Sequence, residues 1–465
     1  MTPTRTTRPV TSRHSLSRRA LIGSAAAVGA TGILAACAPG SSDQPEKKKA
    51  EDISTDVASL GDITLVVWDQ EVRGGQKAQI EALNEAFQKK YPNVTIKRNA
   101  QSFDDLQKTT SLALSGNDVP DVVQVNNARS AMGEFVKAGQ LINLDPYAEK
   151  YGWKDRYPES VLAKSSYSED GKEFGSGGLY GLAQVGEIVG IFYSKKALEK
   201  HSVKPPTTWD EFIAAVKTIG DAGDQPMILG NIEKWPGLHV FGPLQASSVK
   251  ADDIVKLGMG NAGADWATDD NLKALTTLAD WGKQKAFGPS PNGLDYDAAW
   301  KSFTEGGAAF LPGGSWLAAD MIEPMGDDLG FLAPFPGVDG APATTGGTGI
   351  PFAVPAKAKQ PDAAAAYIDF ITSDDAMKVL AEHDNMPVLN TADLAPESGV
   401  NKDIFEAFGA VSEKGTLLPY LDYATPSFGD TAGNAVQGVI GGQQSPEQAA
   451  EAMQADYEKF TTGAK

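Results

Sequence analysis

Hydrogen-bonding side chains come directly after the first predicted strand of the chain. Trp68, Asp69, Gln70 and Glu71 follow the apolar run 63–67. In open α/β sheets, ligands bind outside the carboxyl ends of the strands, and amide or carboxylate groups can pair with two adjacent hydroxyls. We therefore expect Trp68, Gln70 and Glu71 to contact a small polar ligand. The alternative is that Asp69 and Gln70 only cap the next helix.

A second polar group follows the strand predicted at 120–125. It consists of Asn126, Asn127 and Arg129. Asparagine amides both donate and accept hydrogen bonds, which suits the reading of neighbouring hydroxyls. A plain turn is the alternative interpretation. Tryptophan together with amide side chains in such loops favours a neutral polyol over a cation or a phosphate.

These residues must be positioned by alternating strands and helices. The predicted strands are 63–68, 94–97, 120–125, 189–193 and 308–311, and the predicted helices are 76–90, 103–115, 195–199, 209–219, 251–257, 362–372 and 446–460. Strands that alternate with helices of this length predict βαβ units around a mainly parallel sheet. Thr208 is the expected N-cap of the helix at 209. No repeat of fixed period occurs, which excludes solenoids and propellers.

The composition is that of an acidic globular protein. The 465 residues are 41% hydrophobic and 22% charged, with a formal net charge of −19. Such a surface argues against nucleic acid, whose phosphates require clustered Lys and Arg. It also argues against electrostatic attachment to anionic lipid.

The first 36 residues have the features of an export signal. They contain five arginines and no acidic residue, followed by a short apolar stretch at 20–36. A basic region, a modest apolar region and small residues at the cleavage site are typical of a secretory signal. Ser17-Arg18-Arg19-Ala20-Leu21-Ile22 resembles the twin-arginine motif. We predict a twin-arginine signal peptide at 1–36, whose removal brings the net charge to −24.

Cys37 is the predicted lipidation site. Leu34-Ala35-Ala36-Cys37 resembles a lipobox, in which the cysteine thiol receives diacylglycerol and becomes the new N-terminus. Cys37 is the chain's only cysteine. The alternative is an ordinary buried cysteine. We expect residues 37–60 to form a lipidated, flexible linker that attaches a soluble protein to the membrane.

Several segments together resemble a known family. They are Val67-Trp68-Asp69, Tyr91-Pro92-Asn93-Val94, Gly116-Asn117-Asp118-Val119-Pro120-Asp121-Val122, Gly186-Glu187-Ile188, Phe192-Tyr193-Ser194-Lys195-Lys196, Pro206-Thr207-Thr208-Trp209-Asp210-Glu211, Gly313-Gly314-Ser315-Trp316, Gly346-Gly347-Thr348-Gly349 and 364–370. Each segment is weak evidence alone, but their order and spacing across the chain are specific. The chain resembles the extracellular solute-binding proteins of ABC sugar importers, in the cluster that contains maltose-binding protein.

The resemblance implies an α/β fold with two lobes joined by a hinge. One lobe would comprise 61–186 and 349–388, and the other 187–348 and 389–465, each built on a mainly parallel sheet. It implies capture of a sugar, most simply an oligosaccharide, for delivery to permease subunits, without catalysis, cofactor or metal. We expect a monomer on the outer face of the membrane, and the composition favours a Gram-positive host.

The resemblance also implies roles for individual residues. Trp316 matches the family's stacking tryptophan, Trp235 a second aromatic contact, and Glu187 a sugar contact at the hinge. The loop with Asn126, Asn127 and Arg129 would contact ligand too. Small residues at Gly347 and Thr348 would let the backbone approach the sugar. The late loop with Asp422, Tyr423 and Phe428 would add a final contact.

Other signals in the sequence carry less weight. Gly258-Met259-Gly260-Asn261-Ala262-Gly263 matches GxGxxG but follows a predicted helix, whereas dinucleotide sites follow a strand. The chain has no GxxxxGK[ST] or GxSxG, and its four histidines lack metal-ligand spacing. A secreted glycoside hydrolase stays an alternative, since 60 acidic residues could supply its carboxylate pair. Binding of a peptide or a polyamine is a further alternative.

Overall fold

The computed structural model describes residues 48–463. The predicted signal peptide and the lipidation site Cys37 lie outside them. The described residues form two lobes, each with its own sheet and apolar core. We call the lobe around Ile63–Asp69 the first lobe and the lobe around Gly186–Ser194 the second lobe. The predicted two-lobed α/β fold is confirmed.

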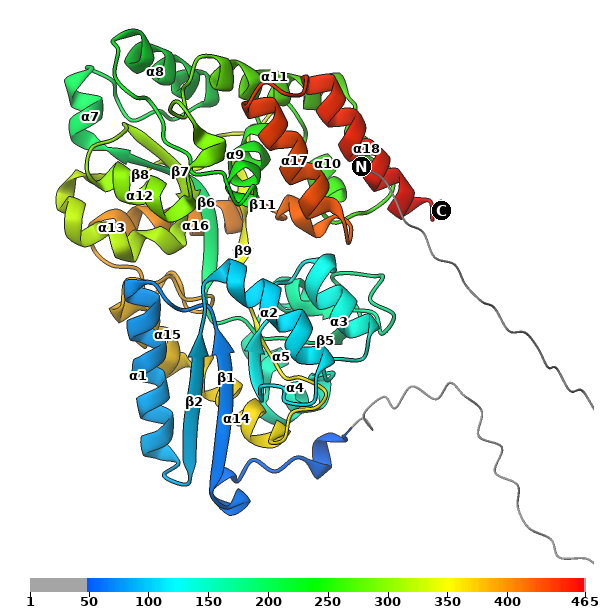
Figure 1. Ribbon diagram of the computed structural model, residues 1–465. Coiled ribbons are helices and arrows are strands. Elements are labelled where there is room, and N and C mark those ends of the chain that lie inside the picture. The colour runs from blue at the N-terminus through cyan, green and yellow to red at the C-terminus, as the bar shows by residue number, and fades with distance from the viewer. Residues whose placement is uncertain (1–47, 464–465) are drawn as a thin grey trace, which may run out of the picture. The chain divides into compact units, whose positions relative to one another are not determined.

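The first lobe is built on a four-stranded sheet in the order β10-β3-β1-β2. Strand β1 pairs in parallel with β2 and with β3, and β10 runs antiparallel to β3. In Figure 1, β1 and β2 run beside the long helix α1. The elements are β1 (Ile63–Asp69), α1 (Gly74–Lys90), β2 (Val94–Ala100), α2 (Phe103–Ser115), β3 (Val122–Gln124), a π-helix (Arg129–Gly133), α3 (Glu134–Lys137), α4 (Asp145–Tyr151), α5 (Trp153–Arg156), α6 (Glu159–Leu162), β4 (Ser166–Tyr167), β5 (Gly178–Leu179), β10 (Phe352–Ala353), α14 (Pro361–Ile371) and α15 (Asp374–Glu382).

Residues just before β1 pack onto this lobe. Ile53 and Val57 are buried in the same core as Leu65, Val67 and Phe87. Lys48 Nζ lies 2.8 Å from Asp362 Oδ1 at the start of α14. The prediction of a flexible linker is therefore wrong for residues 48–60, because two apolar side chains in this segment find a core far away in sequence.

The second lobe has a five-stranded mixed sheet in the order β11-β9-β6-β7, with β8 also on β6. Strand β6 is antiparallel to β7, β8 and β9, and only β11 and β9 are parallel. The mainly parallel arrangement predicted for both lobes is thus wrong for this one. The elements are β6 (Gly186–Ser194), α7 (Lys195–Lys200), α8 (Trp209–Asp221), α9 (Trp235–Gln245), α10 (Ala251–Gly258), α11 (Asp269–Lys283), α12 (Tyr296–Thr304), β7 (Phe310–Gly314), α13 (Ala318–Met325), β8 (Leu329–Phe331), β9 (Ala343–Thr348), α16 (Val400–Lys414), β11 (Thr416–Leu418), α17 (Phe428–Ile440) and α18 (Pro446–Thr461).

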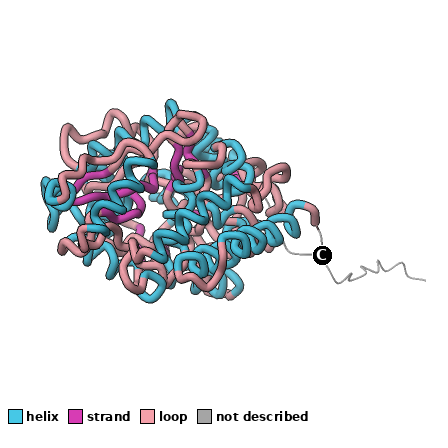
Figure 2. Tube along the Cα trace, turned by 90° about the horizontal axis from the view of Figure 1, so that it is seen from above, coloured by secondary structure: helices cyan, strands magenta, loops and turns pink. Residues whose placement is uncertain are grey.

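Helices cover this second sheet and enclose its strands (Figure 2). The core contains large aromatic side chains such as Phe212, Trp281 and Phe310, which meet edge to face at 5.1–5.9 Å. Helix α8 begins where predicted, because the Thr208 side chain accepts a hydrogen bond from Glu211 N. None of the helices between residues 48 and 463 is long and apolar enough to cross a membrane.

Three chain segments cross between the lobes side by side. Gly186 in β6 pairs with Thr348 in β9. Gly349 N donates to Val185 O at 2.9 Å, and Gly186 N donates to Met386 O at 2.9 Å. These hydrogen bonds join the crossings into one narrow connection beside the site described below.

Candidate ligand-binding site

A cavity of about 370 Å³ is lined by side chains of both lobes. We call it the cleft. Its lining comprises Gln70, Arg73, Gln76, Phe103, Asp104, Gln107, Lys108, Asn126, Ser130, Glu187, Glu233, Lys234, Trp235, Leu238, His239, Trp316, Thr348, Ile350, Tyr420, Asp422, Tyr423, Pro426, Gly429 and Asp430. Many of these residues carry hydrogen-bonding groups or aromatic rings, which suits a polar ligand with apolar faces.

The wall from the first lobe is mainly polar. Gln70 follows β1, and its backbone N donates to Gln124 Oε1 at 2.8 Å, so its place is set by the neighbouring strand. Asn126 follows β3, and its Oδ1 accepts from Ala128 N at 2.8 Å. That bond leaves the Asn126 Nδ2 group without a protein partner among the described residues. Both amides thus lie at the carboxyl ends of parallel strands, where the sequence predicted them.

The wall from the second lobe is aromatic. Ring centroids follow one another from Trp235 to His239 at 5.1 Å, from His239 to Tyr420 at 5.3 Å, and from Tyr420 to Tyr423 at 5.4 Å. Trp316 adjoins His239 at 5.4 Å. Phe103 of the first lobe meets Trp235 at 6.0 Å and continues the row. Such a row can lie against several apolar ring faces in succession.

Gly314 makes room for the ring of Trp316. A Cβ atom on Gly314 would overlap the Trp316 indole. The indole is held from its other end, because Trp316 Nε1 donates to Tyr296 Oη at 2.8 Å. Glycine at position 314 therefore has a steric cause, since the absent side chain lets the indole fold back beside the strand.

Ionisable groups in the cleft are shifted toward their neutral forms. Burial raises the pKa of Glu187 to about 7, although the Tyr420 hydroxyl donates to Glu187 Oε2 at 3.1 Å and opposes that rise. Burial also raises the pKa of Asp422 to about 6 and lowers the pKa of His239 to about 3. Near neutral pH the imidazole is therefore neutral, and Glu187 is ionised less than an ordinary carboxyl, which suits an uncharged ligand.

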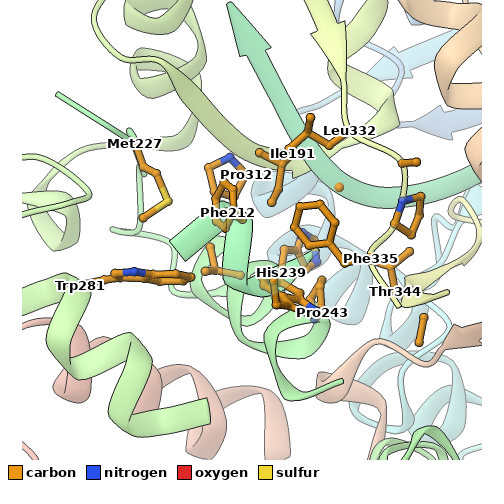
Figure 3. A pocket seen from close by; sticks show the side chains of 16 residues that line it. Ile191, Phe212, Met227, His239, Pro243, Trp281, Pro312, Leu332, Phe335 and Thr344 are labelled. Carbon is orange, nitrogen blue, oxygen red and sulfur yellow. The ribbon is translucent and has the colours of Figure 1, made fainter. Parts of the chain in front are cut away.

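His239 borders a second, smaller cavity inside the second lobe. This cavity measures about 30 Å³, near the space for one water molecule, and Figure 3 shows Phe212, Met227 and Trp281 around it. His239 Nδ1 is buried without a hydrogen-bond partner. His239 therefore borders both the cleft and a small, mainly apolar cavity of the second lobe.

Eight of the predicted site residues line the cleft. They are Gln70, Asn126, Glu187, Trp235, Trp316, Thr348, Asp422 and Tyr423. Six do not line it: Trp68, Glu71, Asn127, Arg129, Gly347 and Phe428.

Local contacts explain most of the displaced residues. Glu71 is buried behind Gln70, with its Oε1 accepting from Gln124 Nε2 at 2.7 Å. Trp68 packs on the apolar cluster that contains Leu106. The Asn127 amide donates to Lys164 O and its Oδ1 accepts from Tyr423 Oη at 3.4 Å, so it supports a cleft residue from behind.

Phe428 and Gly347 were also predicted to contact the ligand, and neither lines the cleft. The Phe428 ring is fully buried against Trp266, with centroids 5.0 Å apart, because that face of α17 points into the core. Phe428 is therefore not available to a ligand. Gly347 lies on β9 opposite Glu187 with a φ of 144°, a backbone conformation that favours glycine.

Arg129 bridges the two lobes and does not face the cleft. Its guanidinium donates to three backbone carbonyls: Nε to Ala424 at 3.1 Å, Nη1 to Lys172 at 2.6 Å and Nη2 to Met259 at 2.8 Å. These bonds engage all three guanidinium nitrogens and hold the group outside the lining of the cleft. Gly260 permits this contact, because a Cβ there would overlap Ala424 O and lie 3.3 Å from Arg129 Nε. The GxGxxG segment thus follows α10 and helps to join the lobes.

Sequence reasoning missed several residues that line the cleft, notably Arg73, Phe103, His239 and Tyr420. His239 could have been found, because it lies four residues after Trp235 and so on the same face of a helix. Arg73 bridges the lobes, with Nη2 3.1 Å from Asp297 Oδ1.

Comparison with known proteins agrees with this architecture. Residues 72–378, more than half of the chain, match the family model described as bacterial extracellular solute-binding protein. The multiple sugar-binding protein of Streptococcus mutans is 25% identical over 376 residues, covering 79% of this chain and 82% of that protein. An uncharacterized ABC transporter extracellular-binding protein of Pyrococcus horikoshii is 26% identical over 365 residues, covering 76% and 77%.

A solved structure shares the fold. A chitin oligosaccharide binding protein superimposes with a TM-score of 0.75 at 21% identity, covering 86% of this chain and 99% of that one. Two lobes, a cleft lined from both of them and a family match over most of the folded part lead to one assignment. The chain belongs to the family of bacterial extracellular solute-binding proteins.

Proposed function

We propose that this chain captures a sugar, most simply an oligosaccharide, in the cleft and delivers it to the permease subunits of an ABC importer. The observation that carries the proposal is that the row of rings from Trp235 to Tyr423 and the amides of Gln70 and Asn126 line one cleft. Rings can stack on the C–H faces of pyranoses, and amides can read their hydroxyls. Relatives with the printed names multiple sugar-binding protein and chitin oligosaccharide binding protein support the same class of ligand.

The chain binds its solute without converting it. Its family consists of binding proteins, so the carboxyl groups of Glu187 and Asp422 serve recognition. A glycoside hydrolase would release shorter sugars from a bound oligosaccharide. Chromatography of the ligand after long incubation with the protein should recover it unchanged.

Ligand binding would close the two lobes on each other as rigid bodies. We assign 61–186 with 349–388 to one body and 187–348 with 389–465 to the other. The narrow connection at Gly186, Thr348 and Met386 supports a hinge there. A ligand that contacts both walls stabilises the closed arrangement by its differential affinity.

A thermal-shift screen tests the proposed ligand class. Monosaccharides, maltodextrins and chitin oligosaccharides would be compared with a peptide mixture and a polyamine. A ligand present at about 100 times its Kd adds roughly 2.7 kcal/mol to stability, which raises the melting temperature clearly. Stabilisation by the peptide mixture or the polyamine, with no sugar active, would refute the proposal.

We further propose that the protein is a lipid-anchored monomer on the outer face of a Gram-positive cell membrane. The twin-arginine leader and the lipobox at Cys37 motivate this proposal. Cys37→Ser should move the protein from the membrane fraction into the medium. Retention of the variant in the membrane fraction would contradict the lipid anchor.

A further inference from the structure

Lys234 lies at the edge of the cleft in a rare backbone conformation. Its φ is 69° and its ψ is −40°, just before helix α9. The backbone N of Trp235 donates to Glu233 O at 2.9 Å, which closes a three-residue turn around Lys234. These values describe a γ-turn with positive φ, a strained turn that residues with a Cβ atom seldom adopt.

The surrounding structure holds this turn in place. Asn231 is fully buried, and its Oδ1 accepts from Gly237 N at 2.8 Å in the first turn of α9. Asn231 O accepts from Lys234 N at 3.2 Å and from Gln437 Nε2 at 2.8 Å. Strain persists only where neighbours over-determine the conformation, and here a buried hydrogen-bonded hub does so.

A second anchor acts on the residue before Lys234. Glu233 Oε2 accepts from Tyr296 N at 3.2 Å. The same tyrosine lies against the ring of Trp235 at 4.5 Å and accepts the hydrogen bond from Trp316. Tyr296 therefore supports the strained turn, Trp235 and Trp316 together.

The turn determines where the Trp235 side chain lies. Trp235 is the first residue after the turn, it lines the cleft, and its Nε1 is buried without a hydrogen-bond partner. Because this N–H is buried, a ligand in the cleft would contact the ring of Trp235. The stem of Lys234 lies against α17, since a Cβ on Gly433 would lie 3.1 Å from Lys234 Cβ.

The geometry points to Lys234 as a positioning residue, whose strained γ-turn holds Trp235 in its ligand-contacting orientation. This inference rests on the proposed function of the cleft. Glycine adopts the same φ without strain but gives the turn more freedom. Relief of strain should stabilise the free protein, whereas freedom at Trp235 should weaken binding. Opposite changes in stability and affinity therefore distinguish positioning from a general structural role.

Three variants separate the contributions. Lys234→Gly removes both the strain and the ammonium group, and Lys234→Ala removes the ammonium but retains the strain. Lys285→Gly is the matched control, because Lys285 has a φ of 58° after α11 and does not line the cleft. Each variant is melted without ligand and titrated calorimetrically with the sugar that stabilises the wild type most.

We expect Lys234→Gly to melt at an equal or higher temperature and to bind about three- to fivefold more weakly. Lys234→Ala also removes a side chain that lines the cleft, and it should lose less affinity than Lys234→Gly because it retains the strained turn. Lys285→Gly should melt higher with unchanged affinity. The inference fails if Lys234→Gly binds like wild type, if it loses both stability and affinity, or if Lys234→Ala loses as much affinity as Lys234→Gly.

A readout without ligand keeps this test separate from the proposed function. The indole N–H signal of Trp235, assigned with Trp235→Phe, should broaden or shift in Lys234→Gly while that of Trp266 stays unchanged. An unchanged Trp235 signal would overturn the inference even if sugars bind. If no sugar binds wild type, the proposed function fails, and this signal alone decides whether the turn positions Trp235.

Discussion

The two walls of the cleft differ in chemistry and in support. The first-lobe wall offers amides at strand ends, where Gln70 and Asn126 are held by bonds to neighbouring backbone or side-chain groups. The second-lobe wall offers rings that hold one another, with Trp316 bonded to Tyr296 and His239 among three aromatic neighbours. The amides supply direction and the rings supply contact area. A ligand that binds tightly must contact both walls at once. Selectivity for the ligand and closure of the lobes therefore depend on the same contacts.

The contacts that join the walls differ in a similar way. Arg73 meets Asp297 in a partly exposed ion pair, with side chains 18% and 50% exposed. Arg129 is 4% exposed and bonds three carbonyls without a carboxylate. Exposed ion pairs contribute little and weaken with salt, whereas truncation of Arg129 would leave the buried Ala424 carbonyl without this donor. Closure of the lobes should therefore depend more on the hydrogen bonds of Arg129 than on the ion pair between Arg73 and Asp297.

The largest expected effect on binding is that of Trp316→Ala. Loss of a stacked indole should weaken sugar binding by about 2–4 kcal/mol, roughly 30- to 1000-fold. Calorimetric titration measures the change. Trp266→Phe serves as a control, because Trp266 is fully buried away from the cleft and should affect melting without affecting Kd. If Trp316→Ala lowers the apo melting temperature strongly but leaves Kd unchanged, the aromatic wall has only a structural role.

Arg129→Met should have the next largest effect. The variant loses three charge-assisted hydrogen bonds, two of which (to Ala424 O and Met259 O) join the lobes, and we expect about 1–3 kcal/mol weaker binding through a less stable closed state. Scattering measurements with saturating ligand should show a more open average. Asp297→Asn provides the comparison, with a loss below about 1 kcal/mol that shrinks in high salt. Equal effects of both variants would contradict the difference between the two contacts.

Glu187→Gln tests the charge state at the hinge end of the cleft. The pKa of Glu187 is raised from 4.5 to about 7. The folded state therefore binds the proton more tightly, and this contribution to stability is present below pH 4.5 and lost as pH rises through 7. We expect the wild type to lose on the order of 1–2 kcal/mol relative to Glu187→Gln between these pH values. Denaturant unfolding at several pH values measures it, and parallel curves would show that Glu187 is ionised normally.

Gln70→Ala should have the smallest effect. The backbone bond from Gln70 to Gln124 stays, so the fold should be unaffected. Loss of one hydroxyl-reading amide should weaken binding by about 0.5–1.5 kcal/mol. Calorimetric titration of Gln70→Ala and Trp316→Ala compares how much binding free energy each wall of the cleft contributes. A larger loss for Gln70→Ala would reverse the comparison and assign most of the binding energy to the polar wall.

The sequence by itself determined the strands and helices from β1 to β3, the family and the polar strand ends. The periodicity of 63–68 and 76–90 and the Thr208 cap are local features, and β1, α1 and α8 follow them closely. Gln70 and Asn126 line the cleft. They could be predicted because the end of a strand is visible in the sequence. The steric need for glycine before Trp316 is likewise local.

Only the tertiary structure decided which of the neighbouring polar residues face the cleft. The partners of Arg129 lie 43, 130 and 295 residues away, so no local pattern shows that its donors are occupied. Phe428 turns into the core and His239 toward the cleft because helix packing sets the rotation of α17 and α9. Ile53 and Val57 are ordered by a distant core. Local pattern records the propensity of a segment, whereas burial and hydrogen-bond partners depend on what the rest of the chain brings beside it.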